Sequence, residues 1–138
     1  MKQRVPVTQI MSKDLVTLNP TQSLYDAEKL FNKHSIRHIP VVEGERIVGV
    51  ISRSDLLRIS FADLNENEET VDSVVYDMYT IPQVMTRVPV SVESDATVKE
   101  VAEMLAKQSF HSIPVVDNGK LVGIVTTTDL INYLLEQY

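Results

Sequence analysis

The amino-acid sequence repeats itself at a fixed spacing. When the chain is shifted by 74 residues, Ile39-Pro40-Val41-Val42 falls on Ile113-Pro114-Val115-Val116 without a gap. Further pairs matched at the same spacing are Val48-Gly49 with Val122-Gly123, Asp55-Leu56 with Asp129-Leu130, and Met11 with Met85. So many ungapped matches indicate two copies of one supersecondary unit. The fold is therefore expected to contain the same unit twice.

Both copies predict the same first elements. Short extended pieces at Leu15–Leu18 and Val88–Val92 open them. A helix follows in each, because Ser23 with Asp26, and Thr97 with Glu100, have the spacing of capping boxes. Apolar residues then recur on one helical face. These faces consist of Leu24, Ala27, Leu30 and Phe31 in the first copy and of Val98, Val101, Met104 and Leu105 in the second.

A hairpin and a second helix complete each copy. The apolar runs Ile39–Val42 and Ile47–Ile51 are joined by a short polar turn, and the second copy has Asn118-Gly119 there, a strong hairpin signal. The second helix starts near Ser52 or Ser54, and near Thr126 or Thr128 in the other copy. Each copy is therefore a β-α-β-β-α unit, and the fold class is α/β (α+β).

Size predicts how the copies are organised. A single copy is too small to bury much surface, so we expect the two to pack as a pseudo-twofold pair that shares a core. Residues 1–60 are the first repeat, 61–79 a connecting segment and 80–138 the second repeat. The connecting segment has six acidic residues and no basic one, and the whole chain has a net charge of −6. We expect a solvated loop at Asn65–Glu69 and a short helix or ordered strap at Val71–Tyr79.

Composition excludes several classes of protein and of site. The 138 residues include no cysteine, which excludes disulfides, thiolate metal sites and cysteine nucleophiles. No apolar run approaches the roughly 20 residues that span a bilayer, and the first residues lack the apolar core of a signal peptide, so we expect a cytoplasmic protein away from membranes. The basic residues form no continuous stripe, which argues against a duplex nucleic-acid partner. Catalytic motifs and a metal site are not identifiable, and we expect no enzyme activity.

The ordered motifs Arg37–Val42, Ile47–Leu57 and His111–Leu130 resemble those of the CBS domain, named for cystathionine β-synthase. The resemblance covers nearly the whole chain. It implies a tandem pair that binds AMP, ADP, ATP or S-adenosylmethionine in the cleft between the repeats, with no obligatory cofactor. It also implies a regulatory role, a homodimer and a regulated partner protein. The second chain would cover helix faces that are only partly covered within one chain, namely Leu24, Leu30 and Phe31 in the first copy and Val98, Met104 and Leu105 in the second.

Candidate ligand-binding residues follow from that resemblance. A hydroxyl and a carboxylate stand three residues apart at the start of each second helix, as Ser52 with Asp55 and Thr126 with Asp129. The family places its ribose-binding acid there, and the hydroxyl and backbone N–H groups of a helix start can meet a phosphate. The same spacing also forms a capping box, and the two roles are compatible.

Other candidates surround these pairs. Arg37 and His111 are basic residues at equivalent positions, where the family often has basic residues that meet phosphates, and the alternative is that both are exposed residues at a strand edge. Arg53 gives the first site another possible cation. Thr127 replaces Arg53 in the second copy. The adenine would be read through backbone groups and apolar side chains, and the alternative for the apolar ones is simple core packing. The residues concerned are Thr17, Ile39 and Pro40 in the first copy and Ser91, Ile113 and Pro114 in the second.

Two functions fit these observations. The first is a regulatory module that senses adenine nucleotides or a related adenosyl ligand. The second is a ligand-free dimeric scaffold for protein interactions, in which the Ser/Thr and Asp pairs only cap helices.

Overall fold

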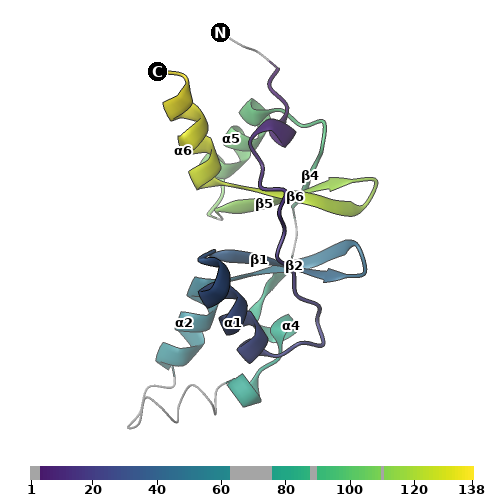
Figure 1. The fold of residues 1–138 in the computed structure, drawn as a ribbon, viewed down its shortest axis with the longest axis vertical. Coiled ribbons are helices and arrows are strands. Elements are labelled where there is room, and N and C mark those ends of the chain that lie inside the picture. Colours follow the sequence, from purple (N-terminus) through teal and green to yellow (C-terminus); the bar gives the residue numbers. More distant parts are fainter. Residues whose placement is uncertain (1–3, 63–75, 88–89, 110) are drawn as a thin grey trace. The chain divides into compact units, whose positions relative to one another are not determined.

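The chain forms two compact units, which do not coincide with the two repeats. The computed structural model describes residues 4–62, 76–87, 90–109 and 111–138. One unit spans Val16–Val88, and the other combines Met1–Leu15 with Pro89–Tyr138 (Figure 1). We call them the 16–88 unit and the 89–138 unit, and the second name includes residues 1–15. Residues 1–15 and 80–88, which we call the opening segments of the two repeats, thus each belong to the unit that contains the hairpin of the other repeat.

The 16–88 unit is a three-stranded sheet with its helices on one face (Figure 1). In chain order its elements are α1 (Leu24–His34), β1 (His38–Glu43), β2 (Arg46–Ser52), α2 (Arg53–Ala62), α4 (Ile81–Val84) and β3 (Thr86–Arg87). The strand order is β1-β2-β3, and both pairings are antiparallel. Leu18 forms an isolated parallel bridge with Val41, so the predicted extended piece at Leu15–Leu18 contacts β1 through its last residue.

The 89–138 unit repeats the hairpin and helix pair of the 16–88 unit. Its elements are η1 (Val7–Gln9), β4 (Val92–Glu93), α5 (Val98–Lys107), β5 (Ser112–Asp117), β6 (Lys120–Thr126) and α6 (Thr127–Glu136). The strand order is β4-β5-β6, with β4 parallel to β5 and β6 antiparallel to it. The mixed α/β class predicted from the sequence is confirmed.

Local hydrogen bonds explain where the first helices begin. Ser23 Oγ accepts from the backbone N–H of Asp26 at 3.2 Å, and the Asp26 carboxylate accepts from the Ser23 N–H at 2.9 Å. Thr97 and Glu100 make the same reciprocal pair before α5. Both capping boxes predicted from the sequence are confirmed, and each satisfies backbone N–H groups that the first helical turn leaves open.

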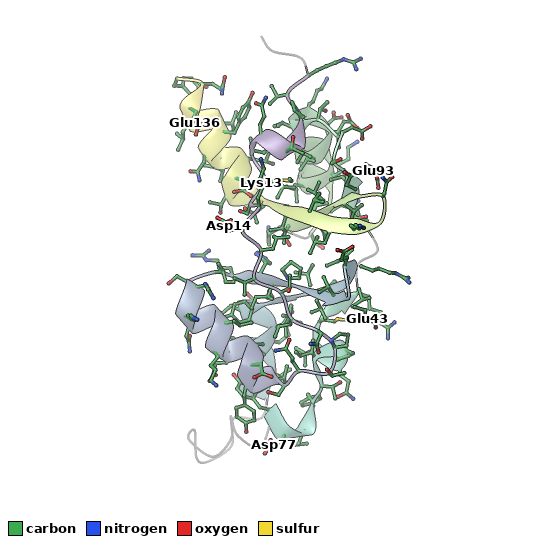
Figure 2. The ribbon with its side chains drawn as sticks, turned by 45° about the vertical axis from the view of Figure 1, so that its right-hand side comes forward. Lys13, Asp14, Glu43, Asp77, Glu93 and Glu136 are labelled. Atoms are coloured by element: carbon green, nitrogen blue, oxygen red, sulfur yellow. The ribbon has the colours of Figure 1, made fainter. Side chains whose placement is uncertain are left out.

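The hairpins are fixed by residues that tolerate positive φ. Gly44 has a φ of 64°, and Asn118 and Gly119 have φ values of 52° and 83°. Glycine and asparagine adopt this left-handed region with little strain, as tight hairpin turns require. Glu43 ends β1 at the first of these turns (Figure 2). The register shifts at Val41/Val42 and again at Val115/Val116, so the irregularity is repeated along with the strands.

Each unit has its own hydrophobic core. Leu24 and Phe31 of α1 pack with Ile39 and Ile51 in the 16–88 unit, and all four are at most 1% exposed. In the 89–138 unit, Val101 packs with the buried residues Val7, Ile113, Val115 and Val125. The expectation that these faces are only partly covered within one chain is wrong for Leu24, Phe31 and Val98, which are buried within their own unit. Leu30, Met104 and Leu105 are half-buried.

The opening segments close the cores of the units they join. Ser12 exchanges two backbone hydrogen bonds with Ile124 of β6, at 2.8 and 3.1 Å. Thr86 pairs with Val50 of β2 at the equivalent place in the other unit. Beside these pairings, Met85 lies against Gly49 and Met11 lies against Gly123, so closely that a Cβ at either glycine would overlap the methionine sulfur. Both glycines therefore allow a methionine side chain to approach the sheet backbone.

Part of the connecting segment re-enters the 16–88 unit. Residues 76–78 form a helical turn that includes Asp77 (Figure 2). Tyr76 is buried there, its hydroxyl donates to Glu28 Oε2 at 2.7 Å, and its ring stands edge-on to Tyr25. The predicted loop at Asn65–Glu69 and the first part of the predicted strap at Val71–Tyr79 lie outside the described residues. No helix among the described residues is long and apolar enough to cross a membrane.

Candidate functional site

The predicted ligand residues of the first repeat gather where β1 begins and α2 begins. His38 of β1 pairs with Ser52 of β2, and the backbone N–H of Arg53 donates to the carbonyl of Arg37 at 2.9 Å. This pairing brings the residue before β1 beside the first turn of α2. Arg37, Ser52, Arg53 and Asp55 therefore lie in one neighbourhood of the 16–88 unit.

The second repeat builds the same neighbourhood in the 89–138 unit. Ser112 pairs with Thr126, and the N–H of Thr127 donates to the carbonyl of His111 at 3.0 Å. The Thr127 hydroxyl also reaches that carbonyl, at 3.4 Å. His111, Thr126 and Asp129 are brought together as the sequence predicted. We call the two neighbourhoods the first site and the second site.

At the first site, Ser52 and Asp55 form a reciprocal capping pair. The Asp55 N–H donates to Ser52 Oγ at 3.1 Å, and Asp55 Oδ2 accepts from the Ser52 N–H at 2.8 Å. Of the two starts left open by the sequence, α2 therefore begins after Ser52. The serine hydroxyl keeps its own proton to donate, so capping leaves it able to meet a ligand oxygen.

Asp55 is the one buried charged residue that the structure records among the described residues, at 5% exposed. Its second oxygen, Oδ1, accepts from Arg58 Nη2 at 2.9 Å. The side chain of Arg58 is 72% exposed, while that of Asp55 is 7% exposed. We did not single out Arg58 from the sequence. Its position three residues after Asp55 on a helix was the available signal, because side chains at that spacing are neighbours.

At the second site, Thr126 and Asp129 make the same capping pair with a less buried carboxylate. Asp129 Oδ2 accepts from the Thr126 N–H at 2.8 Å, and the Asp129 N–H donates to Thr126 Oγ1 at 3.1 Å. Asp129 is half-buried. The position that matches Arg58 is Asn132, so the arginine of the first site has no counterpart in the second.

The basic candidates differ in where their charged groups lie. Arg37 and His111 are exposed. Arg53 is exposed too, but its guanidinium donates from Nη2 to Asn32 Oδ1 at 3.1 Å and lies 5.7 Å from the centre of the Phe31 ring. As placed, the Arg53 guanidinium contacts α1.

The candidates for adenine contact divide into buried and exposed residues. Ile39 and Ile113 are fully buried members of the two cores, and Pro40 and Pro114 are buried as well. Thr17 and Ser91 are exposed. Thr17 precedes Leu18, whose N–H donates to the Pro40 carbonyl at 3.0 Å, and Ser91 precedes Val92, which pairs with Val115. Roles in adenine recognition stay predictions for all six.

The chemistry available at each site is that of hydrogen-bond acceptance and donation. A carboxylate that accepts one backbone N–H can accept further donors, such as the hydroxyls of a sugar. The neighbouring Ser or Thr hydroxyl and a basic side chain suit an anionic group. Within the described ranges, no three His, Asp or Glu side chains form a group that could hold a metal ion.

Solved structures share the fold of the whole chain. The crystal structure of CBSX2 in complex with AMP superposes with a TM-score of 0.79 at 26% identity, covering 96% of this chain and 98% of that one. The CBS domain pair of protein MJ0100, in complex with 5′-methylthioadenosine and S-adenosyl-L-methionine, gives a TM-score of 0.81 at 28% identity over 99% of this chain and all of that one.

Sequence relatives range from short proteins to large enzymes. A CBS domain-containing protein of Dictyostelium discoideum is 31% identical over 96% of this chain and 93% of its own length. The YlbB protein of Bacillus subtilis is 34% identical over 90% of this chain and 78% of its own length. By contrast, the chain spans only 22% of an inosine-5′-monophosphate dehydrogenase of Korarchaeum cryptofilum, at 29% identity.

The family model of the CBS domain matches twice, at residues 7–62 and 81–136. The match at residues 7–62 contains the first hairpin and the first site, and the match at residues 81–136 contains the second hairpin and the second site. The chain belongs to the CBS-domain family, as a tandem pair of CBS domains.

Proposed function

We propose that this protein is a regulatory module that binds an adenosine-containing ligand. The observation that carries the proposal is the pair of carboxylates, Asp55 and Asp129, at equivalent helix starts of the two units. Each would accept hydrogen bonds from ribose hydroxyls. The complexes of related pairs with AMP and with S-adenosyl-L-methionine support an adenosyl ligand.

The two sites are proposed to prefer different ligands. The first has Arg37 and Arg53 near its helix start, whereas the second has His111 and Thr127. A polyphosphate carries several negative charges and is costly to enclose without cations. ATP and ADP are therefore expected at the first site, and AMP or a less charged adenosyl compound at the second.

The ribose role can be tested by removing each carboxylate. Asp55→Ala and Asp129→Ala should each weaken binding at its own site by roughly 1.5–3 kcal/mol, the scale of hydrogen bonds to a charged group. Isothermal titration calorimetry with AMP, ATP and S-adenosylmethionine gives the affinities. Asp26→Ala is the matched control, because Asp26 makes the same capping pair with Ser23 outside both sites. Unchanged affinity in both site variants would contradict the ribose role.

A homodimer is part of the proposal, with a different surface from the one expected from the sequence. On α6, Ile131, Leu134 and Leu135 are 52%, 57% and 65% exposed. Their spacing places them on one face of the helix, whose last residue is Glu136 (Figure 2). We propose that a second copy of the chain covers this face. A single species of 15.6 kDa in sedimentation at micromolar concentration would contradict it.

Regulation would pass through a partner protein. A ligand can shift the arrangement of the module only by its difference in affinity between two states, and a partner would recognise that shift. The module is proposed to act in the cytoplasm, where adenine nucleotides are available, and to catalyse no reaction itself. Mass spectrometry of the small molecules that copurify with the protein would identify the ligand.

The alternative, a ligand-free scaffold, is favoured by one specific observation. Both carboxylates already accept a backbone N–H from their capping partner. Under this alternative, Asp55→Ala and Asp129→Ala would each cost about 1 kcal/mol of stability, the usual effect of losing a cap, and would change no ligand affinity.

A further inference from the structure

The two proposed ribose acceptors differ in one neighbour. Asp55 Oδ1 accepts from Arg58 Nη2 at 2.9 Å, and Asp55 Oδ2 from the Ser52 N–H at 2.8 Å. At the second site, the hydrogen bond recorded for the Asp129 carboxylate is the one from the Thr126 N–H to Oδ2. Asn132 stands where Arg58 would be. Among the described residues, Asp55 thus has a cation on its second oxygen and Asp129 has none.

This difference affects neutral donors most. A ribose hydroxyl and a guanidinium N–H both make charge-assisted hydrogen bonds with a carboxylate, but only the guanidinium also brings a positive charge that neutralises it. A sugar that approaches Asp55 therefore competes with Arg58 for Oδ1 or shares a carboxylate that is already largely neutralised. A sugar that approaches Asp129 meets no such competitor in the part of the chain that the structure describes.

The exposure of the two partners makes the competition reversible. The Asp55 side chain is 7% exposed, so it stays in place, whereas the Arg58 side chain is 72% exposed and can swing into solvent. Exposed ion pairs of this kind are weak, because water and salt screen them. Arg58 would therefore lower the affinity of the first site without closing it.

We propose that Arg58 is a specificity-determining residue that lowers the affinity of the first site for neutral ribosyl ligands. Adenosine then binds more tightly at the second site, where Asn132 leaves Asp129 available. The inference rests on the proposed function, since it assumes that the two carboxylates accept ribose hydroxyls. Because an exposed ion pair contributes little free energy, we expect the adenosine affinities of the two sites to differ by about two- to fivefold.

Exchanging the two residues tests the inference, with adenosine as the probe. In an Asp129→Ala background, which leaves only the first site, Arg58→Asn should tighten adenosine binding about two- to fivefold. In an Asp55→Ala background, which leaves only the second site, Asn132→Arg should weaken it by a similar factor. The second variant installs the ion pair in a unit that lacks it, so a loss of stability in the 16–88 unit cannot produce that result.

Arg46→Asn serves as the matched control. It removes an exposed arginine from the same unit, at the far end of β2, about 20 Å along the strand from Ser52. It should leave adenosine affinity unchanged. Calorimetry of each variant is paired with thermal denaturation, so that affinities are compared at equal folded fractions.

The outcomes separate this inference from the function on which it rests. Opposite shifts in the two exchanged variants support the role of Arg58. Binding of AMP and adenosine by both single-site proteins, with no shift on either exchange, overturns the role of Arg58 and keeps the proposed function. Absence of AMP and adenosine binding in the wild-type protein overturns both.

Discussion

In each unit, a methionine from the opening segment of one repeat packs against a strand glycine of the other repeat. This contact can test whether the two repeats exchange their opening segments. A Cβ added at Gly49 would lie 2.9 Å from Met85 Cγ and 3.0 Å from Cε, and closer still to Sδ. Gly49 is not among the residues with positive φ, so alanine meets no backbone strain there. The clash with Met85, which supplies the three nearest atoms, is expected to dominate the effect of Gly49→Ala.

The expected magnitudes follow from packing. Gly49→Ala forces Met85 off the sheet and should cost about 1–3 kcal/mol, as overpacking does. Met85 is half-buried, so Met85→Ala should cost about 1–2 kcal/mol, below the range for a fully buried methionine. In the double variant the clash is gone. Its cost should therefore be close to that of Met85→Ala alone, which gives a coupling of about 1–3 kcal/mol between the two positions.

Pairing the glycine with the other methionine provides the control. Met11 belongs to the same repeat as Gly49 but contacts Gly123 in the structure. Met11→Ala should therefore rescue Gly123→Ala and add its full cost to Gly49→Ala. Urea denaturation followed by circular dichroism gives the free energy of unfolding of each variant. Rescue of Gly49→Ala by Met11→Ala, or additivity of Gly49→Ala with Met85→Ala, would refute the exchange.

Three further predictions concern single positions. Phe31→Ala removes the largest fully buried side chain and should lower the free energy of unfolding by about 3–5 kcal/mol in the same urea assay, and a loss below 1 kcal/mol would contradict its central place in the core. Thr97→Ala removes the N-cap of α5 and should cost about 1 kcal/mol, whereas Thr97→Ser should cost much less. Leu135→Glu places a charge on the exposed face of α6 and should raise the dimer dissociation constant at least roughly tenfold in sedimentation, and an unchanged constant would exclude this face from the interface.

Features set by near neighbours in the chain could be predicted from the sequence. The caps at Ser23 and Thr97 join residues three apart, and the turn at Asn118-Gly119 depends on two adjacent residues. The alternating strands and helices follow from hydrophobic patterning. The same local signals placed Ser52 with Asp55, and Thr126 with Asp129, at the starts of α2 and α6.

Features set by distant contacts could not be predicted in the same way. Met11 and Met85 are the same residue type, so the sequence gives Gly49 no reason to prefer one over the other. Arg53 contacts Asn32 and Phe31, about twenty residues earlier, and no pattern in the sequence specifies that direction. The burial of Leu24, Phe31 and Val98 could not be predicted for a similar reason, because it depends on how the sheet and the opening segment close over the helices.

The exchange of opening segments has a consequence for the origin of the chain. Each unit is completed by the opening segment of the other repeat. A protein with a single repeat would have no such segment to receive within its own chain. Two copies could complete each other by trading their first residues, and fusing two such genes end to end would preserve every contact. On this reasoning, dividing the present chain between the repeats should yield halves that fold only by exchanging opening segments, either with the other half or with a second copy of the same half.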